Sequence, residues 1–344
     1  MCRIVFFLSL LACVSAVLAQ PSVKVEYAAA DSLEVTAWLA DSTLRSPLDF
    51  ARRLEGRPYV AHTLERGAEH LVVNLRELDC ATLVETASAL SIARSRLERA
   101  ERTLPYALPW ASPQSALTPA VPDAWALFCE ALESLRYRDG RCTDYLSRLH
   151  YLTFWIDDHL RRRDVEEVVV GAKWMKRRTT DIHFMSTHPD KYAGLKNPDD
   201  VRRMAALEAQ YAGQSFRYIP QEYCGLSKEQ LGAVRDGDIV CIVTTLAGLD
   251  YSHQGIAFWG QDGKLHLLHA SSARRCVVAD ARPLDVYLQG IRSSIGVRIF
   301  RLRSPTWSVL HRPFGRRNAP NGVGRSAVAE CLRAKTITFS ARLS

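Results

Sequence analysis

Residues 251–272 read YSHQGIAFWGQDGKLHLLHASS, in which two runs of strand-forming residues flank a tight turn. Asp262-Gly263 is the strongest hairpin signal in the chain, because the favoured two-residue turn needs positive φ angles that Asp and Gly adopt readily. The runs on either side, Gly255–Trp259 and Leu265–His269, are therefore predicted to pair as antiparallel strands. This hairpin is the part of the sequence that most constrains the fold.

The rest of the chain divides into a helical part and a strand-rich part. Before residue 234, apolar residues recur at helical intervals. The helices expected there are Ser32–Leu54, Thr82–Thr103, Ala124–Tyr137, a segment over 144–160 and part of 190–212. Around the hairpin, the expected strands are Ile239–Thr245, Val277-Val278, Val286-Tyr287 and Ile295–Leu302. Helices followed by a mostly antiparallel sheet predict an α+β fold.

The two ends of the chain are predicted to lie outside the folded part. Residues 1–19 combine Arg3, an apolar run and a terminal Ala19, which is the pattern of a secretory signal peptide. A membrane anchor is the alternative, but the apolar run is short for a span of about 20 residues. Residues 306–344 lose periodicity and predict a disordered tail. Residues 20–305 are thus expected to be a single domain, exported to the periplasm or envelope without stable membrane insertion.

Composition limits the classes of partner. With 47% hydrophobic and 24% charged residues, the chain has an ordinary globular composition. The net charge of +8 is spread along the sequence without a recognisable nucleic-acid module, so no nucleic-acid partner is expected. The basic charge favours an anionic envelope polymer or anionic substrates instead. Of the nine cysteines, Cys2 and Cys13 fall in the signal segment, and the remaining odd number leaves at least one thiol unpaired.

Cys80 is the first candidate for catalysis. In Asp79-Cys80-Ala81-Thr82 it stands at the predicted start of an amphipathic helix. The partial positive charge and free N–H groups of a helix N-terminus stabilise a thiolate, and they can also hold an oxyanion on an attacked carbonyl. A buried structural cysteine is the alternative interpretation, and it is the more common fate of a cysteine.

His253 and His269 are the candidates for proton transfer. His253 stands at the start of the first hairpin strand, where an imidazole can take the thiol proton and later protonate a leaving amine. His269 lies on the neighbouring strand and shares a face with Leu267, so it is placed to orient His253. His266 points to the opposite face and is excluded. A lone histidine before a strand is more often structural, so the pair carries more weight than either residue alone.

Together these segments resemble the NlpC-type cell-wall cysteine peptidases, which have a papain-like core with a cysteine on a helix and a histidine on an adjacent strand. The segments RYRDG at 136–140, SRLHY at 147–151, FMSTHP at 184–189 and GLD at 248–250 are similar to one subgroup, the N-acetylmuramoyl-L-alanine amidase-like family. Carried over by position, Cys80 matches the nucleophile, His253 the base and His269 the orienting residue. The resemblance implies an α+β papain-like core with extra helical insertions.

The resemblance also implies an activity. The expected reaction is hydrolysis of the amide between N-acetylmuramic acid and L-alanine in peptidoglycan fragments, through a thioester and without a cofactor. Two alternatives stay open: a γ-D-glutamyl-diamino acid endopeptidase acting on the stem peptide, and a non-catalytic muropeptide-binding protein. Acyl transfer on lipids by a relative of this fold is disfavoured, because such relatives have the histidine before the cysteine, whereas Cys80 precedes His253 here.

A second group of polar residues is expected to bind substrate. It stands close to predicted turns and supplies side chains suited to a sugar or a peptide carboxylate. Its members are Arg136, Tyr137, Arg138, Ser147, Arg148 and His150. Solvated helix ends are the alternative interpretation of the same residues. No metal site is expected, because Asp181, His183 and His188 lack further ligands, and His159 is expected on a helix surface.

Overall fold

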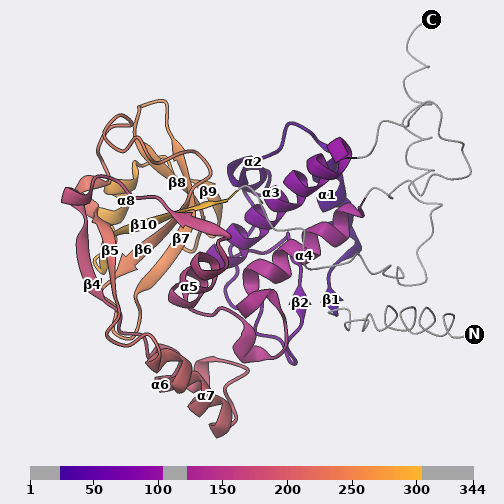
Figure 1. Ribbon diagram of the computed structural model, residues 1–344, viewed down its shortest axis with the longest axis horizontal. Helices are drawn as coiled ribbons and strands as arrows, with labels where there is room; N and C mark the ends of the chain where they lie inside the picture. The colour runs from indigo at the N-terminus through magenta and orange to yellow at the C-terminus, as the bar shows by residue number, and fades with distance from the viewer. Residues whose placement is uncertain (1–23, 104–121, 304–344) are drawn as a thin grey trace, which may run out of the picture. The chain divides into compact units, whose positions relative to one another are not determined.

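The computed structural model describes residues 24–103 and 122–303, which form a mixed α+β unit around one large antiparallel sheet (Figure 1). The predicted signal peptide at 1–19 and tail at 306–344 lie outside the described residues. In the ranges that are described, no helix is both long and apolar enough to cross a membrane.

The large sheet has eight strands in the order β4-β5-β10-β6-β7-β8-β9, with β3 also paired to β10, and all of these pairings are antiparallel. The strands are β3 (Val165–Glu167), β4 (Lys176–Thr179), β5 (Ser215–Pro220), β6 (Ile239–Thr244), β7 (Tyr251–Trp259), β8 (Leu265–Ser271), β9 (Cys276–Ala279) and β10 (Ser294–Leu302). A short parallel pair joins β1 (Val25–Glu26) to β2 (Leu71–Val72). The predicted hairpin is confirmed: β7 and β8 pair across a turn in which Gly263 has φ of 72°.

Most helices precede the central strands of the sheet in the chain. They are α1 (Ala29–Ala40), α2 (Pro47–Arg53), α3 (Cys80–Thr103), α4 (Ala124–Arg136), α5 (Leu152–Arg162), α6 (Phe184–Thr187), α7 (Pro198–Ala209) and α8 (Leu284–Gln289). Two short 3₁₀ turns, η1 (Arg138–Gly140) and η2 (Tyr145–Ser147), link α4 to α5. α3 packs against α2, α4 and β7, so its first turn lies beside the central hairpin (Figure 1).

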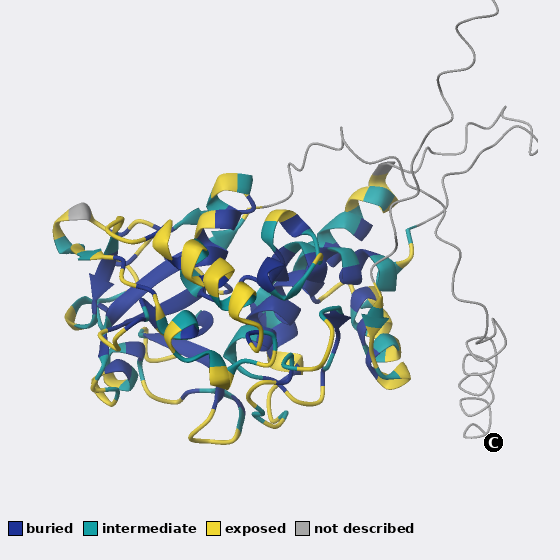
Figure 2. Cartoon of the chain, turned by 90° about the horizontal axis from the view of Figure 1, so that it is seen from below, coloured by how far each residue is buried: buried dark blue, intermediate teal, exposed yellow. Residues whose placement is uncertain are grey.

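The two faces of the sheet are covered by different elements. Alternate residues of β6 illustrate this: Ile239 and Cys241 join the core formed with α1 to α5, whereas Val240 and Ile242 join a second core. Leu284 of α8 belongs to that second core. The central strands and α3 are accordingly the most deeply buried parts of the described chain (Figure 2). Near-continuous burial of the β6 sequence IVCIVT follows from this double covering.

Two of the expected helices are wrong in extent. The helix expected over Ser32–Leu54 is two helices, because Ser46 and Asp49 form a capping box that starts α2 with Pro47 in its first turn. The helix expected over 144–160 is η2 followed by α5. In the second case the break falls at residues 148–151, where the backbone is extended at both ends and Tyr151 precedes α5 without a side-chain cap.

Two further expectations are also wrong. Val286-Tyr287 was expected as strand and belongs to α8, which covers a sheet face instead of extending the sheet. His159 was expected at a surface and is fully buried, where Nδ1 lies 3.0 Å from an Asp164 carboxylate oxygen and Nε2 lies 3.0 Å from Leu135 O. Both ring nitrogens are satisfied, which is what burial of an imidazole requires.

Candidate active site

Cys80 is the first residue of α3 and is partly buried. Asp79 caps the helix: its Oδ1 accepts hydrogen bonds from Ala81 N at 3.0 Å and Thr82 N at 2.8 Å. Burial raises the pKa of the Cys80 thiol to about 12, and the Asp79 carboxylate adds to this rise. Backbone N–H groups of Gln254, Cys80 and Ala81 that donate toward the sulfur oppose it. The thiol is therefore protonated at neutral pH in the unliganded site.

His253 and His269 lie on neighbouring strands, as the sequence predicted, and their rings touch. His253 Nε2 lies 2.7 Å from His269 Nδ1, with the ring planes nearly perpendicular. His253 is the third residue of β7, so it lies within the strand instead of preceding it. Burial, together with the neighbouring His269, lowers the pKa of His253 to about 3. His253 is thus a neutral imidazole whose Nδ1 remains for another partner.

Asp280 extends this pair of histidines. Its Oδ2 lies 3.6 Å from His269 Nε2, and the Arg282 guanidinium donates to both carboxylate oxygens, at 3.0 and 2.8 Å. The hydrogen bonds from Arg282 lower the pKa of Asp280 to about 2, so the carboxylate is charged. A charged acceptor beside Nε2 favours the His269 tautomer that carries its proton there. His269 Nδ1 then accepts from His253 Nε2–H, which leaves His253 Nδ1 unprotonated and able to act as a base.

Cys80 and His253 open into the same cavity of about 160 Å³. Gln254, the residue after His253, lines it as well and donates its N–H to the sulfur. The opposite wall comes from the segment before α5 and from α5 itself, and it includes His150 and Trp155. A thiol and a neutral imidazole that share a small cavity beside backbone donors can carry out nucleophilic attack on a carbonyl.

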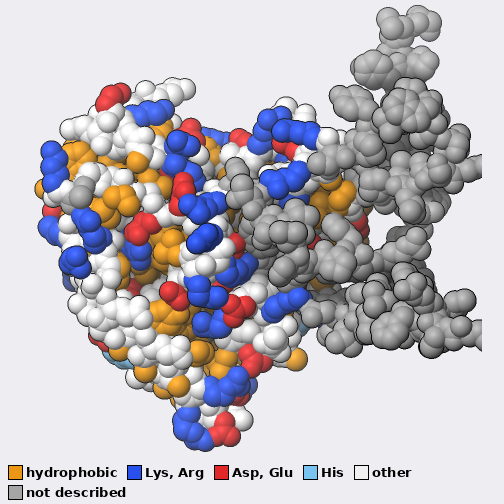
Figure 3. All heavy atoms as spheres, viewed as in Figure 1, with side chains coloured by type: hydrophobic (Ala, Val, Ile, Leu, Met, Phe, Trp, Pro, Cys, Tyr) orange, Lys and Arg blue, Asp and Glu red, His pale blue; other side chains and the backbone are white. Residues whose placement is uncertain are grey.

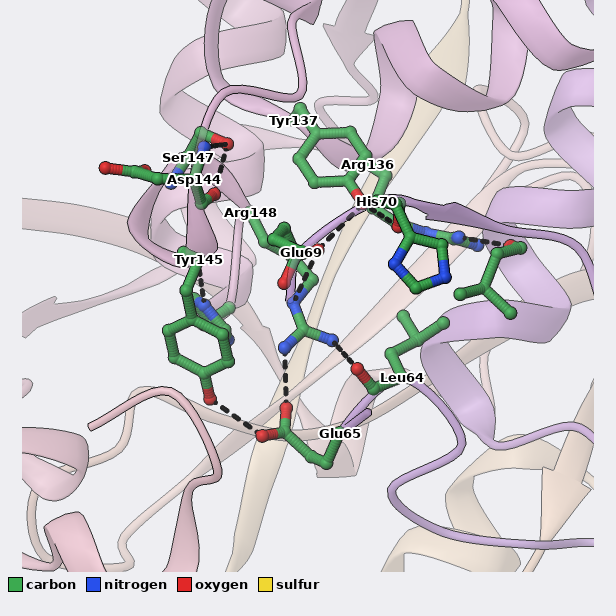
Figure 4. A network of polar contacts seen from close by, with 12 residues as sticks. Leu64, Glu65, Glu69, His70, Arg136, Tyr137, Asp144, Tyr145, Ser147 and Arg148 are labelled. Atoms are coloured by element: carbon green, nitrogen blue, oxygen red, sulfur yellow. Dashed lines mark hydrogen bonds and ion pairs between the residues drawn. The ribbon is translucent and has the colours of Figure 1, made fainter. Parts of the chain in front are cut away.

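Arg136 and Tyr137, predicted to bind substrate, are buried and bonded within the protein. Arg136 Nε donates to Glu85 Oε2 at 2.7 Å and its Nη1 donates to Val72 O at 2.6 Å. Tyr137 Oη donates to Glu69 Oε1 at 2.8 Å. Figure 4 shows these side chains within one polar network that joins α4 to the chain before α3. Glu85, the carboxylate partner of Arg136, also lines the Cys80 cavity.

The Cys80 cavity is not lined by Arg148, Ser147 or Arg138. Arg148 Nη2 donates to Glu65 Oε1 at 2.6 Å, in the network of Figure 4. Asp144 caps η2, since its Oδ1 accepts from the backbone N–H of Ser147 at 2.9 Å, and Ser147 Oγ accepts from Asp144 N at 3.3 Å in return. Arg138 and Ser147 both line a separate cavity of about 380 Å³, which does not include Cys80. The structure therefore does not bring these three residues to the Cys80 cavity.

His150 is the member of the predicted binding group that lines the Cys80 cavity. Its Nε2 lies 2.8 Å from Tyr145 O, and burial lowers its pKa well below the usual value, so the ring is neutral. The sequence interpretation missed Trp155 and Glu85 in this wall and Asp280 behind His269. A signal for Asp280 exists in hindsight, because it directly follows the strand that pairs with the His269 strand.

The residues weighed as a metal site from the sequence, Asp181, His183 and His188, do not line the Cys80 cavity. Within residues 24–103 and 122–303, no group of three or more His, Cys, Asp or Glu side chains is placed to hold a metal ion. His183 Nδ1 lies 3.0 Å from Asp181 Oδ1 and forms an exposed pair. On the face shown in Figure 3, Lys and Arg side chains stand among Asp and Glu instead of gathering in one patch.

Comparison with known proteins places the chain in a family. Residues 49–295 match the AmiA-like family, described as N-acetylmuramoyl-L-alanine amidase-like. A crystal structure of an N-acetylmuramoyl-L-alanine amidase from Bacteroides uniformis is 35% identical, covers 75% of this chain and 97% of its own, and has a TM-score of 0.62. The chain belongs to the AmiA-like family of N-acetylmuramoyl-L-alanine amidase-like proteins.

Two other solved structures are similar. One is a protein from Bacteroides fragilis, named as a proposed xylanase, at 31% identity, 74% coverage of this chain, 100% of its own and a TM-score of 0.60. Protein LPG0564 from Legionella pneumophila, of the DUF1460 family, is 19% identical, covers 79% of this chain and 94% of its own, has a TM-score of 0.54 and shares the fold. A search of curated proteins found no match.

Proposed function

We propose that this protein is a cysteine amidase that hydrolyses the N-acetylmuramoyl-L-alanine amide of peptidoglycan fragments, on an NlpC-type papain-like core. The observation that carries the proposal is the shared cavity of Cys80 and His253, with His253 Nε2 held 2.7 Å from His269 Nδ1. Membership of the amidase-like family supports the choice of bond. Cys80 is the nucleophile, His253 the base and His269 the residue that orients it.

The reaction begins as His253 Nδ1 takes the Cys80 proton while the sulfur attacks the lactyl carbonyl carbon. Backbone N–H groups of Cys80 and Gln254, which lie against the sulfur, stabilise the oxyanion. The C–N bond then breaks, and the alanine nitrogen takes the proton from His253, which leaves a thioester. Water attacks the thioester, gives a proton to His253, and the sulfur leaves and is reprotonated. No cofactor takes part in these steps.

The walls of the site support small substrates. His150 and Trp155 come from the helical insertion between Cys80 and His253, and they narrow the Cys80 cavity to about 160 Å³. We therefore propose released muropeptides, not intact sacculi, as the substrates. Export to the periplasm or cell envelope follows from the same substrate class and from the signal-peptide pattern of residues 1–19.

The name of one similar structure suggests xylan cleavage as a rival. Glycoside hydrolases usually need two carboxyl groups, one of them free to donate a proton. In the Cys80 cavity the carboxylates are Glu85, which is paired with Arg136, and Asp250, which accepts from Thr153 Oγ1 at 2.9 Å. With both carboxylates committed to protein partners, the thiol and imidazole are the groups left for catalysis.

The test is digestion of purified muropeptides by the wild-type chain, by Cys80→Ala and by Cys276→Ala, a matched control at another partly buried cysteine. We expect wild type and Cys276→Ala to release the disaccharide and an intact stem peptide, and Cys80→Ala to release neither. Mass spectrometry of the products separates the amidase from an endopeptidase, which would release a dipeptide still attached to the sugar. Equal activity of wild type and Cys80→Ala would overturn the mechanism.

A further inference from the structure

A second cavity, of about 370 Å³, begins where the Cys80 cavity ends. Ser252 and His253 line both cavities, whereas Cys80 lines the smaller one and not the larger one. The volume of the larger cavity falls within the range of about 300–1,000 Å³ that is usual for small-molecule sites. His253 therefore stands between two chambers, one with the nucleophile and one without it.

The two chambers differ in charge. The larger chamber includes Arg274, Arg282, four serines and Tyr287, and none of the described Asp or Glu residues lines it. The smaller chamber has the opposite character, with Glu85 and Asp250 in its lining, His and aromatic side chains, and no Lys or Arg. A cationic, hydroxyl-rich chamber suits a ligand with carboxylates. A chamber with aromatic rings and hydrogen-bond acceptors suits a neutral ligand rich in hydroxyl groups.

Arg274 is the cation available in the larger chamber. Its side chain is exposed, and among the described residues none forms a hydrogen bond or ion pair with its guanidinium. Arg282 is committed instead to Asp280, through hydrogen bonds of 3.0 and 2.8 Å. An arginine can bind a carboxylate with two parallel N–H groups, so Arg274 can supply both recognition and orientation.

The chemistry of amide cleavage assigns the two halves of the substrate to the two chambers. After attack, the acyl half is bonded to the sulfur and must occupy the chamber that Cys80 lines. The leaving amine takes its proton from His253 Nδ1, so its nitrogen lies between the sulfur and this ring, and the rest of the leaving half can extend past His253 into the larger chamber that His253 also lines. In a muramoyl-L-alanine amide the acyl half is the neutral sugar and the leaving half is the stem peptide, which carries carboxylates from its second residue onward.

We propose that the larger chamber is the stem-peptide subsite and that Arg274 binds the free α-carboxylate of the second stem residue, a γ-linked glutamate. This inference rests on the proposed amidase function and adds the orientation of the substrate and a residue that determines specificity. Arg274 acts on the leaving half and makes no contact with the reacting atoms. The enzyme thus prefers stems whose second residue is a free acid over stems in which it is amidated.

The test uses two substrates that differ in one group: N-acetylmuramoyl-L-alanyl-D-glutamate and its α-amide, the isoglutamine form. Release of the dipeptide is followed with wild type, Arg274→Gln, Arg274→Lys and Arg275→Gln. Arg275 is a matched control, because it is the next residue, is also exposed and does not line the chamber. Arg282 is left intact because it holds Asp280.

We expect Arg274→Gln to lower kcat/KM for the acid substrate about tenfold and to leave kcat/KM for the amide substrate within about twofold of wild type. Arg274→Lys should recover part of the loss on the acid substrate. Arg275→Gln should match wild type on both substrates. Release from both substrates with an equal effect of Arg274→Gln on each would overturn the subsite while leaving the amidase standing. No release from either substrate by wild type would overturn the amidase and the subsite together.

Discussion

Replacing Asp280 tests whether the carboxylate behind His269 sets the protonation of the histidine pair. Asp280→Ala removes the charged partner 3.6 Å from His269 Nε2 and leaves Arg282, whose side chain is 47% exposed, free to be solvated. At 3.6 Å this contact is electrostatic and is longer than a hydrogen bond, and two unit charges about 4 Å apart at an effective dielectric constant of about 20 interact by about 4 kcal/mol, which is an upper bound for a neutral imidazole. We therefore expect kcat/KM to fall roughly ten- to hundredfold.

Asp280→Asn should be more damaging than Asp280→Ala, although it is the smaller change. Arg282 N and Nε both donate to Asp280 Oδ1, so an asparagine will keep its oxygen there and turn its NH₂ group toward His269. The NH₂ group needs an acceptor, so His269 Nε2 must lose its proton and Nδ1 must carry it. His269 Nδ1 then donates to His253 Nε2, which leaves the His253 proton on Nδ1, the nitrogen that should act as the base. In serine proteases a wrong tautomer of this kind costs about 10⁴-fold.

The assay is kcat/KM on a muropeptide as a function of pH, with Asp262→Asn as the control. Asp262 contacts His266 Nε2 at 3.1 Å on the opposite face, so the same change there should leave the rate within about twofold. Burial lowers the pKa of His269 and the Asp280 charge partly offsets this, so removing the charge should lower the pKa further and move the acid limb of the profile to lower pH. A lower rate with an unmoved acid limb would indicate a purely structural role. An Asp280→Asn rate no lower than that of Asp280→Ala would refute the tautomer argument.

Two further predictions concern the thiol and the buried network. Because the pKa of Cys80 is raised to about 12, the rate of its alkylation by iodoacetamide should rise about tenfold per pH unit from pH 7 to 10. A rate that reaches a plateau below pH 9 would contradict a protonated resting thiol. Arg136→Met leaves Glu85 buried without its partner and should lower the free energy of unfolding by about 3–5 kcal/mol in urea titrations. The exposed pair of Arg52 with Glu55 is the control, and Arg52→Met should lower the free energy of unfolding by less than about 1 kcal/mol. Equal losses for the two variants would show that burial of the pair does not matter.

The central hairpin could be predicted because its signals are local. Asp262-Gly263 defines a turn by backbone conformation alone, and the alternation after it puts His269 on one face and His266 on the other. The start of α3 was predicted to within two residues, since the helix was expected from Thr82 with Cys80 at its beginning. Such features depend on neighbours a few residues apart, and a single sequence contains them.

The parts that could not be predicted depend on contacts distant in the chain. Asp280 reaches His269 only through the register in which His269 pairs with Val278, and nothing in the sequence fixes that register. The burial of Arg136 was hidden for a similar reason, since an arginine near a turn is usually solvated and its partner Glu85 lies 51 residues away. The sequence therefore identified polar residues near the site but could not separate those that line the cavity from those that support its wall.

The cap of α3 has a consequence for the durability of the protein. Cysteine oxidation to sulfenic and higher acids follows thiolate character, and outside the cytoplasm no reducing pool restores the thiol. By placing a carboxylate next to Cys80, Asp79 begins the helix and also disfavours the thiolate. The enzyme we propose would then keep its nucleophile chemically quiet between turnovers and generate the reactive form when a substrate carbonyl is in place. Resistance to oxidants would thus be a property of the helix cap.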